Sequence, residues 1–327
     1  MRAVWYERTG PAREVLVVGE QPAPHAGPGE VRVWLQASGV NPADCNRRGG
    51  RGYAMEYPLV IPNSDGAGLV DEVGDGVDPA LLGRRVWLYN AQRGRAFGTA
   101  AEWVALDAGL VAPLPDALSY EQGACLGIPG MTAWHCLHMD GPVAGKTVLV
   151  QGGAGAVGQF AVQLARWGGA RVLATVRGAE KGHIAKAAGA AAVIDLHDED
   201  LVARVLELTD GAGVDRVIEV DFGGNLAADL SIVAANGVIA AYASRGEPTP
   251  KLPFYELMRR NITVHAVLLP GTPPAARQAA QAGIGTWLAS GRAQINIAAV
   301  FALQDTALAH LAVESGSKRG TVVVRCA

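Results

Sequence analysis

The sequence lacks the features that mark a disulfide-rich, secreted or membrane-spanning protein. It has only 4 cysteines, and they show neither C-x-x-C spacing nor a dense framework, so a reducing compartment suits them. Its first residues, MRAVWYERTG, lack the apolar core of a signal peptide. No uninterrupted apolar run approaches the ~18 residues that a membrane span requires. We therefore expect a cytoplasmic protein with no membrane partner.

The chain also lacks a strong charge of either sign. It carries 28 Lys and Arg residues against 31 Asp and Glu residues, which gives a formal net charge of -3. Such a surface offers nucleic acid no overall electrostatic footprint, although a local basic patch stays open. Of the 327 residues, 50% are hydrophobic and 18% are charged, as in folded globular proteins. This length exceeds the usual span of one hydrophobic core, so we expect two domains.

The local pattern changes along the chain. Residues 1 to about 120 read as short β-type segments such as VRVWLQASGV, separated by Gly/Pro clusters, and few helices fit there. From about residue 140, strand patterns alternate with helix patterns, beginning with TVLVQ and VGQFAVQLARWG and ending with the helix LAADLSIVAANG and the strand VIAAYAS. After NITVHAVLLPG, a helical stretch, PPAARQAAQAGIGTWLASG, leads to a last strand. This alternation predicts a parallel sheet with helices on both faces.

Three glycines stand between the first of these strands and the helix that follows it. Gly153, Gly155 and Gly158 have the G-x-G-x-x-G spacing. In this context Gly153 permits a tight turn, Gly155 lets the backbone approach a pyrophosphate, and Gly158 allows close packing of the helix. The N-terminus of the helix offers free N–H groups to the phosphates. The alternative is a strand-to-helix turn with no ligand.

The end of the next strand indicates which dinucleotide is bound. An NAD-binding chain places a carboxylate there, about 20 residues after the first glycine. This chain has ATVRGAEK instead, with Arg177 at the strand tip and Lys181 one helical turn later. A guanidinium in that place pairs with a 2′-phosphate, which favours NADPH over NADH. The alternative is that both residues are ordinary solvated charges.

Several motifs in order along the chain carry a resemblance to a known family. SGVNPADCNRRGG fits the pattern N-x-x-D-x-x-x-R-x-G at Asn41, Asp44, Arg48 and Gly50, and it is followed by GRRVW, GTAAEWV, GMTAWHCL, VQGGAGAVGQFAVQLA, IEVDFGG and SKRGTVVV. With these motifs the chain resembles the medium-chain dehydrogenase/reductase superfamily, and within it the zinc-independent quinone oxidoreductase (zeta-crystallin-like) branch. One departure is Leu196, where the branch often has a tyrosine near the adenosine phosphate.

The resemblance implies an α/β fold of two domains. Residues 1–122 and 263–327 would form a GroES-like β-rich catalytic domain. Residues 123–262 would form a Rossmann domain, a doubly wound parallel sheet that binds NADPH. Similar proteins commonly form homodimers through the edge of the Rossmann sheet, which here would be ITVHAVLL.

The resemblance also implies the site residues. The catalytic candidates are Asn41, Asp44, Arg48 and Tyr53. The cofactor-binding candidates are Asn41, Thr132, Gly153, Gly155, Ala156, Val157, Gly158, Thr175, Arg177, Lys181, Tyr242, Ser244, Leu268, Leu269 and Lys318. Tyr53 is the better positional match for a proton donor, with Tyr57 as the other loop tyrosine, and a purely structural role for Tyr53 stays equally open. The basic residues Arg47, Arg48 and Arg51 meet either an anionic substrate or only water.

No metal is expected. The zinc alcohol dehydrogenases of the superfamily have a Cys where this chain has Asn41, and a His-Glu pair where it has Ser64 and Asp65. Catalytic zinc needs about three Cys, His or carboxylate ligands. The nearest other candidates, His135, Cys136 and His138, stand at a predicted helix start, where such side chains more often pack than bind a metal.

Three functions remain open at this point. The leading one is NADPH-dependent reduction of quinones or α,β-unsaturated carbonyl compounds, which needs an oriented hydride and hydrogen bonds rather than a metal. The second is an enoyl-thioester reductase acting on acyl-CoA or a carrier protein. The third is an NADPH-binding protein that binds RNA or serves a structural, crystallin-like role.

Overall fold

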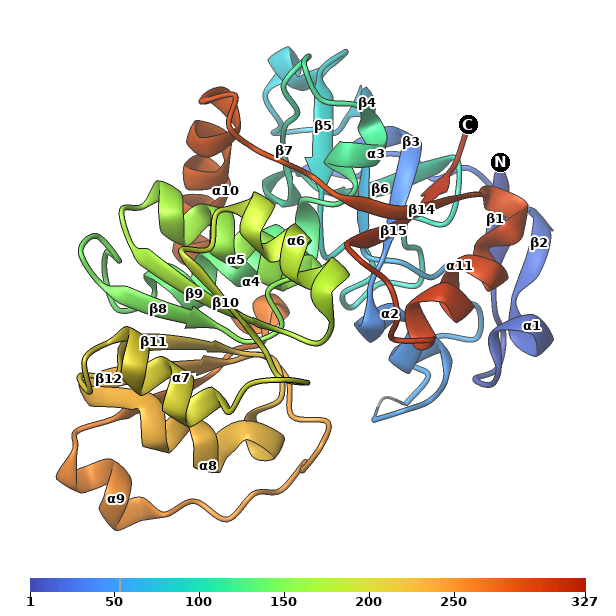
Figure 1. Cartoon of the computed structure of the whole chain (residues 1–327). Coiled ribbons are helices and arrows are strands. Elements are labelled where there is room, and N and C mark those ends of the chain that lie inside the picture. Colours follow the sequence, from blue (N-terminus) through green and yellow to red (C-terminus); the bar gives the residue numbers. More distant parts are fainter. Residues whose placement is uncertain (53) are drawn as a thin grey trace. The chain divides into compact units, whose positions relative to one another are not determined.

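The computed structural model describes residues 1–52 and 54–327. They form two compact units, one made of Met1–Pro129 with Ile295–Ala327 and the other of Gly130–Gln294. Each unit is built on its own sheet (Figure 1). The predicted domain boundaries, after residues 122 and 262, concern domains that fold independently. The division into two compact units does not test them, so they remain predictions.

The first unit is a largely antiparallel β structure. A two-stranded sheet pairs β1 with β2, and a seven-stranded sheet has the order β14-β15-β3-β4-β5-β7, with β6 also pairing β3. The strands are β1 (Arg2–Trp5), β2 (Val17–Glu20), β3 (Glu30–Val40), β4 (Asp65–Val73), β5 (Arg85–Leu88), β6 (Trp103–Asp107), β7 (Val111–Pro113), β14 (Ile297–Ala302) and β15 (Thr321–Arg325). The last strand, β15, lies antiparallel to β3 (Figure 1), so the C-terminal segment completes the N-terminal sheet.

Alternation of side chains along β3 explains how this sheet makes a core. Val31, Val33 and Leu35 are fully buried, whereas Trp34 between them is 40% exposed. A strand with one face on the core and one toward solvent has this pattern. The helices of the unit are short: α1 (Ala12–Val15), α2 (Pro42–Arg48), α3 (Tyr120–Gly123) and α11 (Thr306–Glu314), with 3₁₀ turns η1 (Pro79–Leu81), η2 (Ala108–Leu110) and η4 (Leu303–Asp305).

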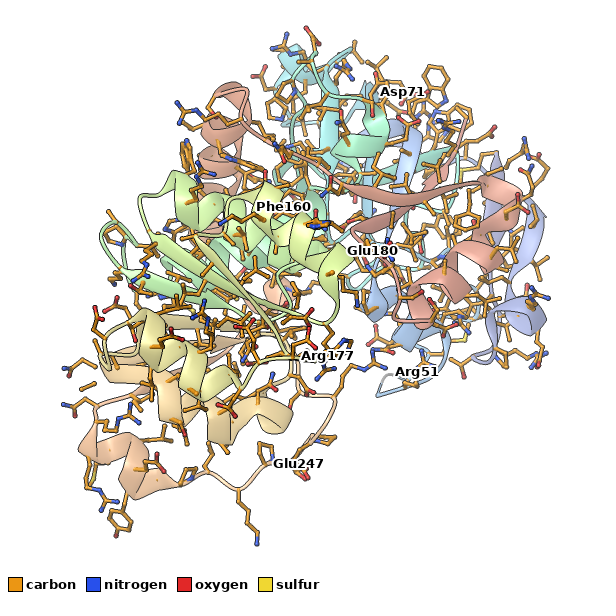
Figure 2. The ribbon with its side chains drawn as sticks, in the orientation of Figure 1. Arg51, Asp71, Phe160, Arg177, Glu180 and Glu247 are labelled. Carbon is orange, nitrogen blue, oxygen red and sulfur yellow. The ribbon has the colours of Figure 1, made fainter. Side chains whose placement is uncertain are left out.

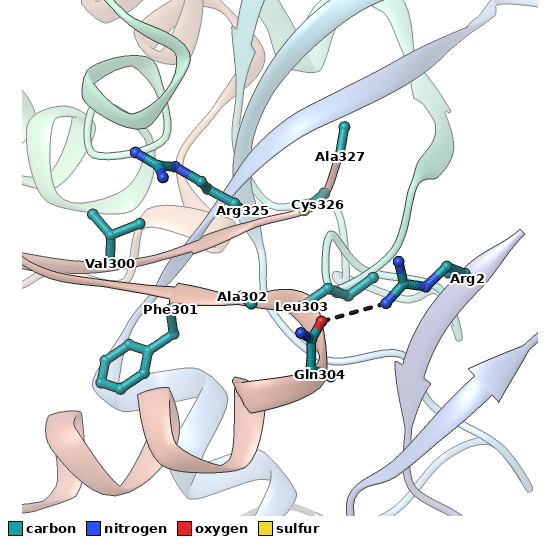
Figure 3. Close-up of a pocket in the computed structure, with 9 residues that line it drawn as sticks. All are labelled: Arg2, Val300, Phe301, Ala302, Leu303, Gln304, Arg325, Cys326 and Ala327. Carbon is teal, nitrogen blue, oxygen red and sulfur yellow. Dashed lines mark hydrogen bonds between the residues drawn. The ribbon is translucent and has the colours of Figure 1, made fainter.

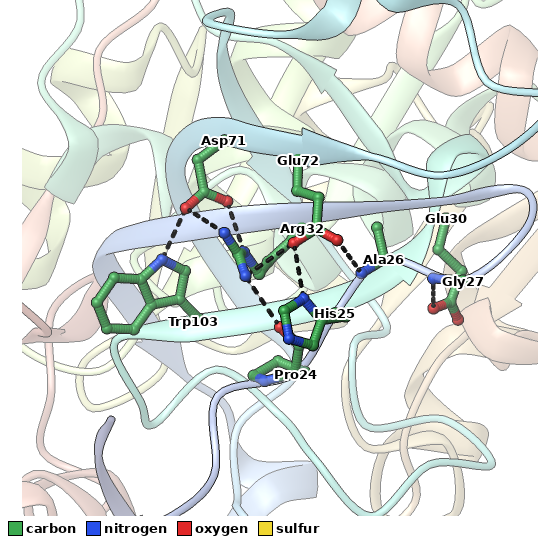
Figure 4. Close-up of polar contacts among 9 residues, drawn as sticks. All are labelled: Pro24, His25, Ala26, Gly27, Glu30, Arg32, Asp71, Glu72 and Trp103. Atoms are coloured by element: carbon green, nitrogen blue, oxygen red, sulfur yellow. Dashed lines mark hydrogen bonds and ion pairs between the residues drawn. The ribbon is translucent and has the colours of Figure 1, made fainter.

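A cluster of polar and charged side chains joins β3, β4 and β6 (Figure 4). Arg32 pairs with Asp71 through Nε (2.9 Å) and with Glu72 through Nη1 (2.7 Å). Trp103 donates from its indole N–H to Asp71 (2.9 Å), and Arg32 also donates to the carbonyl of Pro24 (3.3 Å). These contacts fasten the segment before β3 onto the sheet, and partial exposure keeps each ion pair modest in energy.

The second unit contains a six-stranded sheet of order β10-β9-β8-β11-β12-β13, in which every pairing is parallel. Its strands are β8 (Thr147–Val150), β9 (Arg171–Val176), β10 (Ala192–Asp195), β11 (Val214–Glu219), β12 (Val233–Ala241) and β13 (Thr263–Ala266). Its helices are α5 (Ala156–Trp167), α6 (Ala179–Ala188), α7 (Leu201–Leu208), α8 (Phe222–Ile232), α9 (Phe254–Arg259) and α10 (Pro274–Ala289), with η3 (Leu269–Gly271). Helix α4 (Gly127–His138) precedes β8.

The strand order places the ligand-binding edge of this sheet. The chain runs from β8 outward to β10, then returns and runs from β11 outward to β13. Since parallel crossovers are right-handed, the helices of the two halves cover opposite faces, and the order reverses between β8 and β11. Ligands of such sheets bind at the carboxyl ends of the strands at this reversal. The predicted fold class, a β-rich unit with a doubly wound parallel sheet, is confirmed.

One pair of predicted element boundaries is wrong. The helix expected over LAADLSIVAANG ends at Ile232, and β12 begins at Val233, five residues before the expected strand. Asn236 has a φ of 61°, which lies in the left-handed region, and the pairing with β11 shifts register beside it. The sequence ANG therefore makes an irregularity within a strand rather than the end of a helix.

The four cysteines are buried thiols of low reactivity. Cys45, Cys125, Cys136 and Cys326 are buried and unpaired, and burial raises the pKa of each thiol to about 12. Their protonated form is therefore stable at neutral pH. In the described part of the chain, no helix combines the length and the apolar character needed to cross a membrane.

The packing of α10 gives a test of the second unit. A methyl group at Gly283 would lie 2.0 Å from the ring of Trp134, whereas Gly285 on the same helix has open space around it. Both changes to alanine gain about 1 kcal/mol of helix propensity. We therefore expect Gly285→Ala to raise the melting temperature slightly and Gly283→Ala to lower it, with overpacking costing about 1–3 kcal/mol. Equal melting temperatures for the two variants would contradict this packing.

Candidate functional site

The turn between β8 and α5 is fastened to the end of β9. The N–H of Gly152 donates to Thr175 Oγ1 (2.9 Å), and the N–H of Gly153 donates to the carbonyl of Thr175 (2.8 Å). Gly155 is exposed and is the N-cap residue of α5. The N–H groups of Ala156 and Val157 in the first turn have no helical carbonyl before them, so they are available to an anion.

The three glycines of the motif have different structural tasks. Gly152, with a φ of 69°, makes the tight turn that the sequence analysis assigned to Gly153. A methyl group at Gly153 would lie 2.8 Å from Ala174 Cβ, so this glycine permits close packing on β9. At Gly158 it would lie 2.2 Å from the carbonyl oxygen of Gly152, so α5 packs directly on the turn. Gly155 has only the Gly152 oxygen nearby (3.3 Å), which leaves space for a phosphate.

Two uncommitted cations follow β9. Arg177 is exposed (Figure 2), and Lys181 is half-buried in the first turn of α6. Neither has an ion-pair partner among the residues that the structure describes. Asp195 at the end of β10 fixes the loop between them, because its carboxylate accepts the N–H of Gly178 at 2.9 and 3.1 Å. These hydrogen bonds, with a third from the N–H of His197, lower the pKa of Asp195. Asp195 was not among the predicted site residues, although an acidic residue at the end of a strand is the signal for such a contact.

The segments after β11 and β12 are locked to each other. Asp221 accepts the N–H groups of Arg245 and Gly246, both at 2.7 Å. The hydroxyl of Ser244 accepts the N–H of Gly223 (2.9 Å) and donates to a carbonyl within its own turn. Ser244 therefore shapes the carboxyl edge of the sheet. Tyr242 lies at the same edge, and burial raises the pKa of its phenol.

In the first unit, Asn41 begins α2 at the centre of a buried polar cluster. Its N–H donates to Asp44 (2.8 Å) in the first turn of the helix, and its side-chain amide donates to Asp65 (2.7 Å) at the start of β4. Ser64 donates to the other oxygen of Asp44 (2.9 Å), and the N–H of Ile128 donates to Asp65 (2.8 Å). The cluster therefore fixes the orientation of the Asn41 side chain from both sides.

The two carboxyl groups of this cluster are strongly perturbed. Burial raises the pKa of Asp44, and burial together with the charge of Asp44 raises the pKa of Asp65 well above its usual range. Asp65 Oδ1 has no hydrogen-bond partner among the described residues. This oxygen also explains why residue 127 is a glycine, because a methyl group there would lie 2.3 Å from it.

A second buried series of polar groups supports Asp65, and no sequence pattern indicated it. Thr99 donates to the carbonyl of Asp65 (2.6 Å), and its hydroxyl lies 2.7 Å from that of Ser38. Asn63 donates to Ser38 (3.0 Å) and accepts from Nε2 of His310 (2.9 Å). Burial and the nearby guanidinium of Arg48 lower the pKa of His310 to about 3, so this histidine is neutral and structural.

The remaining catalytic candidates have different placements. Arg48 is 1% exposed, and it bonds to Glu314 on α11 (2.6 Å) and to the carbonyl of Gly10, which is a contact that holds α2 in place. Arg51 shares Glu314 (2.9 Å). Tyr53 lies outside the described residues. Tyr57 packs against a small hydrophobic cluster in the first unit.

The other cofactor candidates fall in both units. Thr132 is buried on α4, Leu268 is 66% exposed, and Leu269 is buried at the start of η3. Lys318, in the first unit, donates to the carbonyl of Gly320 (3.3 Å), and burial lowers its pKa. The structure thus brings Asn41 and Asp44 together in one unit and the glycine turn and Thr175 together in the other.

The residues present do not fit a zinc ion. Asn41 and Ser64 stand at the positions of two zinc ligands, but both donate hydrogen bonds to carboxylates. In the described ranges, no cluster of three His, Cys, Asp or Glu side chains could hold a metal. Cys136 is a buried thiol, and the ring of His138 packs on Trp134 at 4.1 Å between centroids, so both serve packing.

A pocket on the first unit contains none of these residues (Figure 3). Arg2 and Arg325 are its cations, but Arg2 donates to Gln304 (3.3 Å) and Arg325 pairs with Glu121 (2.8 Å). Both guanidinium groups of this pocket therefore already have a partner within the chain. The glycine turn of the second unit and the Asn41 cluster of the first unit are the two candidate functional regions, each described within its own unit.

Comparisons with known proteins give a consistent family. The profile described as "Alcohol dehydrogenase GroES-like domain" matches residues 27–116, and the one described as "Zinc-binding dehydrogenase" matches residues 156–282. The chain is 34% identical to a quinone oxidoreductase of Rattus norvegicus over 75% of this chain and 74% of that protein. It is 30% identical to a quinone oxidoreductase of Pseudomonas aeruginosa over 95% of each. A mycobacterial structure in complex with NADPH has a TM-score of 0.88 at 31% identity, covering 99% of this chain and 100% of the other.

The open space at Gly155 gives a test of the glycine turn. Gly155→Val should leave the melting temperature nearly unchanged, because little surrounds the position, while the new side chain blocks the approach of a phosphate. We expect the Kd for NADPH, measured by fluorescence titration, to rise at least about tenfold, the equivalent of losing one charged hydrogen bond. Gly285→Val, far along the chain in α10, is the control. A wild-type Kd in Gly155→Val would show that phosphate binds elsewhere.

Proposed function

Because the chain belongs to the quinone oxidoreductase branch of the medium-chain dehydrogenase/reductase superfamily, we propose that it reduces quinones or α,β-unsaturated carbonyl compounds with NADPH and without zinc. It is an oxidoreductase of that superfamily. The observation that carries the proposal is the glycine turn at the strand reversal, with exposed Gly155 and the uncommitted cations Arg177 and Lys181 beside it.

The residues of the second unit would hold the cofactor. The N–H groups of Ala156 and Val157 would bind the pyrophosphate, and Arg177 with Lys181 would bind the 2′-phosphate. Asp195 does not compete for the ribose, since its carboxylate already accepts the N–H of Gly178. When bound, NADPH supplies the hydride. We keep Thr132, Tyr242, Ser244, Leu268, Leu269 and Lys318 as proposed cofactor contacts.

The Asn41 cluster would orient the reactants. Asn41 is fixed by Asp44 and Asp65, so its side chain loses little freedom when a partner binds. Reduction of an electron-poor acceptor requires a positioned hydride and then a proton, and no alkoxide has to be stabilised by a metal. We propose Tyr53 as the proton donor. Arg48, through Glu314 and Gly10, would position α2 and hence Asn41.

The edge of the parallel sheet supports a homodimer. Strand β13 is the last in the strand order, so its outer edge has no partner strand among the described residues. Such edges pair with a second copy or must be protected. The four thiols, all unpaired, suit the reducing cytoplasm, which is where we place the enzyme.

An enoyl-thioester reductase is the second candidate. A stretch of a phthioceranic/hydroxyphthioceranic acid synthase of Mycobacterium tuberculosis is 33% identical over 76% of this chain and 12% of that protein. The exposed guanidinium of Arg51 would suit a phosphate of acyl-CoA, although it already forms an ion pair with Glu314.

A substrate panel tests the proposed function. NADPH oxidation should be fast with simple quinones or enones and slow with enoyl-CoA thioesters, and prior treatment with a chelator should leave the rates unchanged. Activity on enoyl-CoA alone would select the second candidate. Oxidation of no acceptor despite tight NADPH binding would favour a binding protein, and a loss of rate on chelation would contradict zinc independence.

Cofactor choice gives a sharper prediction. Arg177→Ala should lower kcat/KM for NADPH about tenfold, because one charged hydrogen bond is worth roughly 1.5–3 kcal/mol and solvent screens this exposed site. Activity with NADH should change little. Arg177→Asp should go further by repelling the 2′-phosphate, and the double change at 177 and 181 removes compensation by Lys181. Arg171→Ala, at the opposite end of β9, is the matched control.

The readout is the ratio of kcat/KM for NADPH to that for NADH, with one quinone at fixed ionic strength. An unchanged ratio in the double variant would mean that these two cations do not bind the 2′-phosphate.

A further inference from the structure

A buried pair of carboxyl groups lies at the reversal of the strand order in the second unit. Glu219 ends β11 and Asp229 lies on α8, and both are fully buried. Glu219 Oε2 and Asp229 Oδ2 are both buried and have no donor among the described residues. The charge of Glu219 helps to raise the pKa of Asp229, as expected of two neighbouring carboxyl groups. Two carboxyl groups can hydrogen-bond only if one of them carries a proton.

Hydrogen bonds connect this pair to the glycine turn. The amide of Gln151 donates to Asp229 Oδ1 (3.1 Å), and its oxygen accepts from the hydroxyl of Thr175 (2.8 Å). Thr175 Oγ1 in turn accepts the N–H of Gly152 (2.9 Å). All three side chains, Gln151, Thr175 and Asp229, are nearly inaccessible to solvent, so water cannot replace a lost partner.

The donor in each hydrogen bond of this series follows from the first one, at Gly152. The N–H of Gly152 can only donate, so Thr175 must use its own hydrogen for Gln151. The NH₂ group of Gln151 then faces Asp229 Oδ1, and a proton on Asp229 Oδ2 completes the chain at Glu219 Oε2. The other oxygen of Glu219 accepts from Asn225 (2.9 Å) and from the N–H of Asp221. The donors of Gly152, Thr175 and Gln151 therefore point toward Asp229, and two further donors point at Glu219.

We propose that Asp229 is held as a neutral carboxylic acid that donates to Glu219, and that this proton positions Gln151 and Thr175 and thereby the phosphate-binding turn. The proton itself is a property of the unliganded chain, and only its effect on NADPH rests on the proposed function. Asp229, Gln151 and Thr175 are positioning residues in this proposal.

The surroundings support a neutral acid at this position. Burial and the charge of Glu219 raise the pKa of Asp229 to about 9. No Lys, Arg or His of the described residues bonds to either carboxyl group. Tyr242 also lies near Glu219, and burial keeps its phenol protonated by raising its pKa. Asp221 bonds to Glu219 through its backbone N–H, while its carboxylate accepts the N–H groups of Arg245 and Gly246. Above pH 9 the pair would hold two like charges, which would repel each other and disturb the chain.

Infrared spectroscopy of the cofactor-free protein tests the proton directly. The wild type at pH 7 should show a carboxylic-acid C=O stretch that is missing from Asp229→Asn, and the band should disappear as the pH rises through about 9. Asp44 and Asp65 are buried acids too, so the difference between wild type and variant is the measurement. Asp210→Asn, an exposed position, should leave the spectrum unchanged in this region. A difference spectrum without this band would overturn the proposal.

Binding tests the positioning role. Asp229→Asn should keep the Kd for NADPH within about twofold, because the amide can donate to Glu219 and accept from Gln151. Asp229→Ala leaves a buried amide unpaired and should raise the Kd roughly tenfold. Wild-type affinity should fall above pH 9, and that fall should be absent from Asp229→Asn.

Failure of the positioning role and failure of the proposed function would give different results. A folded Asp229→Asn that binds as poorly as Asp229→Ala, or that keeps the alkaline fall in affinity, would overturn the positioning role. If Asp229→Ala does not fold, the spectrum and the pH profile of Asp229→Asn decide the matter. A wild type that shows the acid band but binds no NADPH would contradict the proposed function and leave the proton in place.

Discussion

The close approach of α5 to the turn before it is the contact on which the cofactor half of this chain depends. Gly158 lies so near Gly152 that a methyl group would come within 2.2 Å of the Gly152 oxygen. The left-handed conformation of Gly152 and the bond from its N–H to Thr175 follow from the same geometry. Because the turn is held this tightly, the N-terminus of α5 and the end of β9 keep a fixed spacing, and a dinucleotide needs that spacing to bind both its phosphates and its adenosine.

Both units place buried acids, without a bonded cation, beside the residues that would hold the reactants. In one unit Asp65 accepts from Asn41, and in the other Asp229 accepts from Gln151. Burial raises the pKa of both acids. A neutral carboxyl group orients a neighbouring amide without adding a negative charge beside it. These acids therefore hold the neighbouring amides rigidly. Because their pKa values are raised in the folded state, the free energy of unfolding falls as the pH rises toward the folded-state pKa.

The sequence predicted the features that depend on neighbours along the chain. The strand before the glycine turn, the helix after it and the cations that follow β9 are each defined by a few adjacent residues, and the fold class is confirmed. It misplaced the start of β12, because one left-handed Asn236 makes a break that resembles a helix end. It also assigned the tight turn to Gly153, since spacing alone does not distinguish Gly152 from its neighbour. The network from Asp229 to Gly152 joins residues as much as 78 positions apart, and only the sheet brings them together.

The position of Asp195 shows how a chain with a carboxylate near this loop can be compatible with the proposed binding of NADPH. An acidic side chain at the tip of β9 would meet the ribose hydroxyls, but this one stands at the end of β10, the neighbouring strand. Both of its oxygens accept the N–H of Gly178, so its charge stabilises the loop that carries Arg177. This negative charge thus holds the backbone of the loop, and under the proposed function Arg177 and Lys181 would be available to a 2′-phosphate.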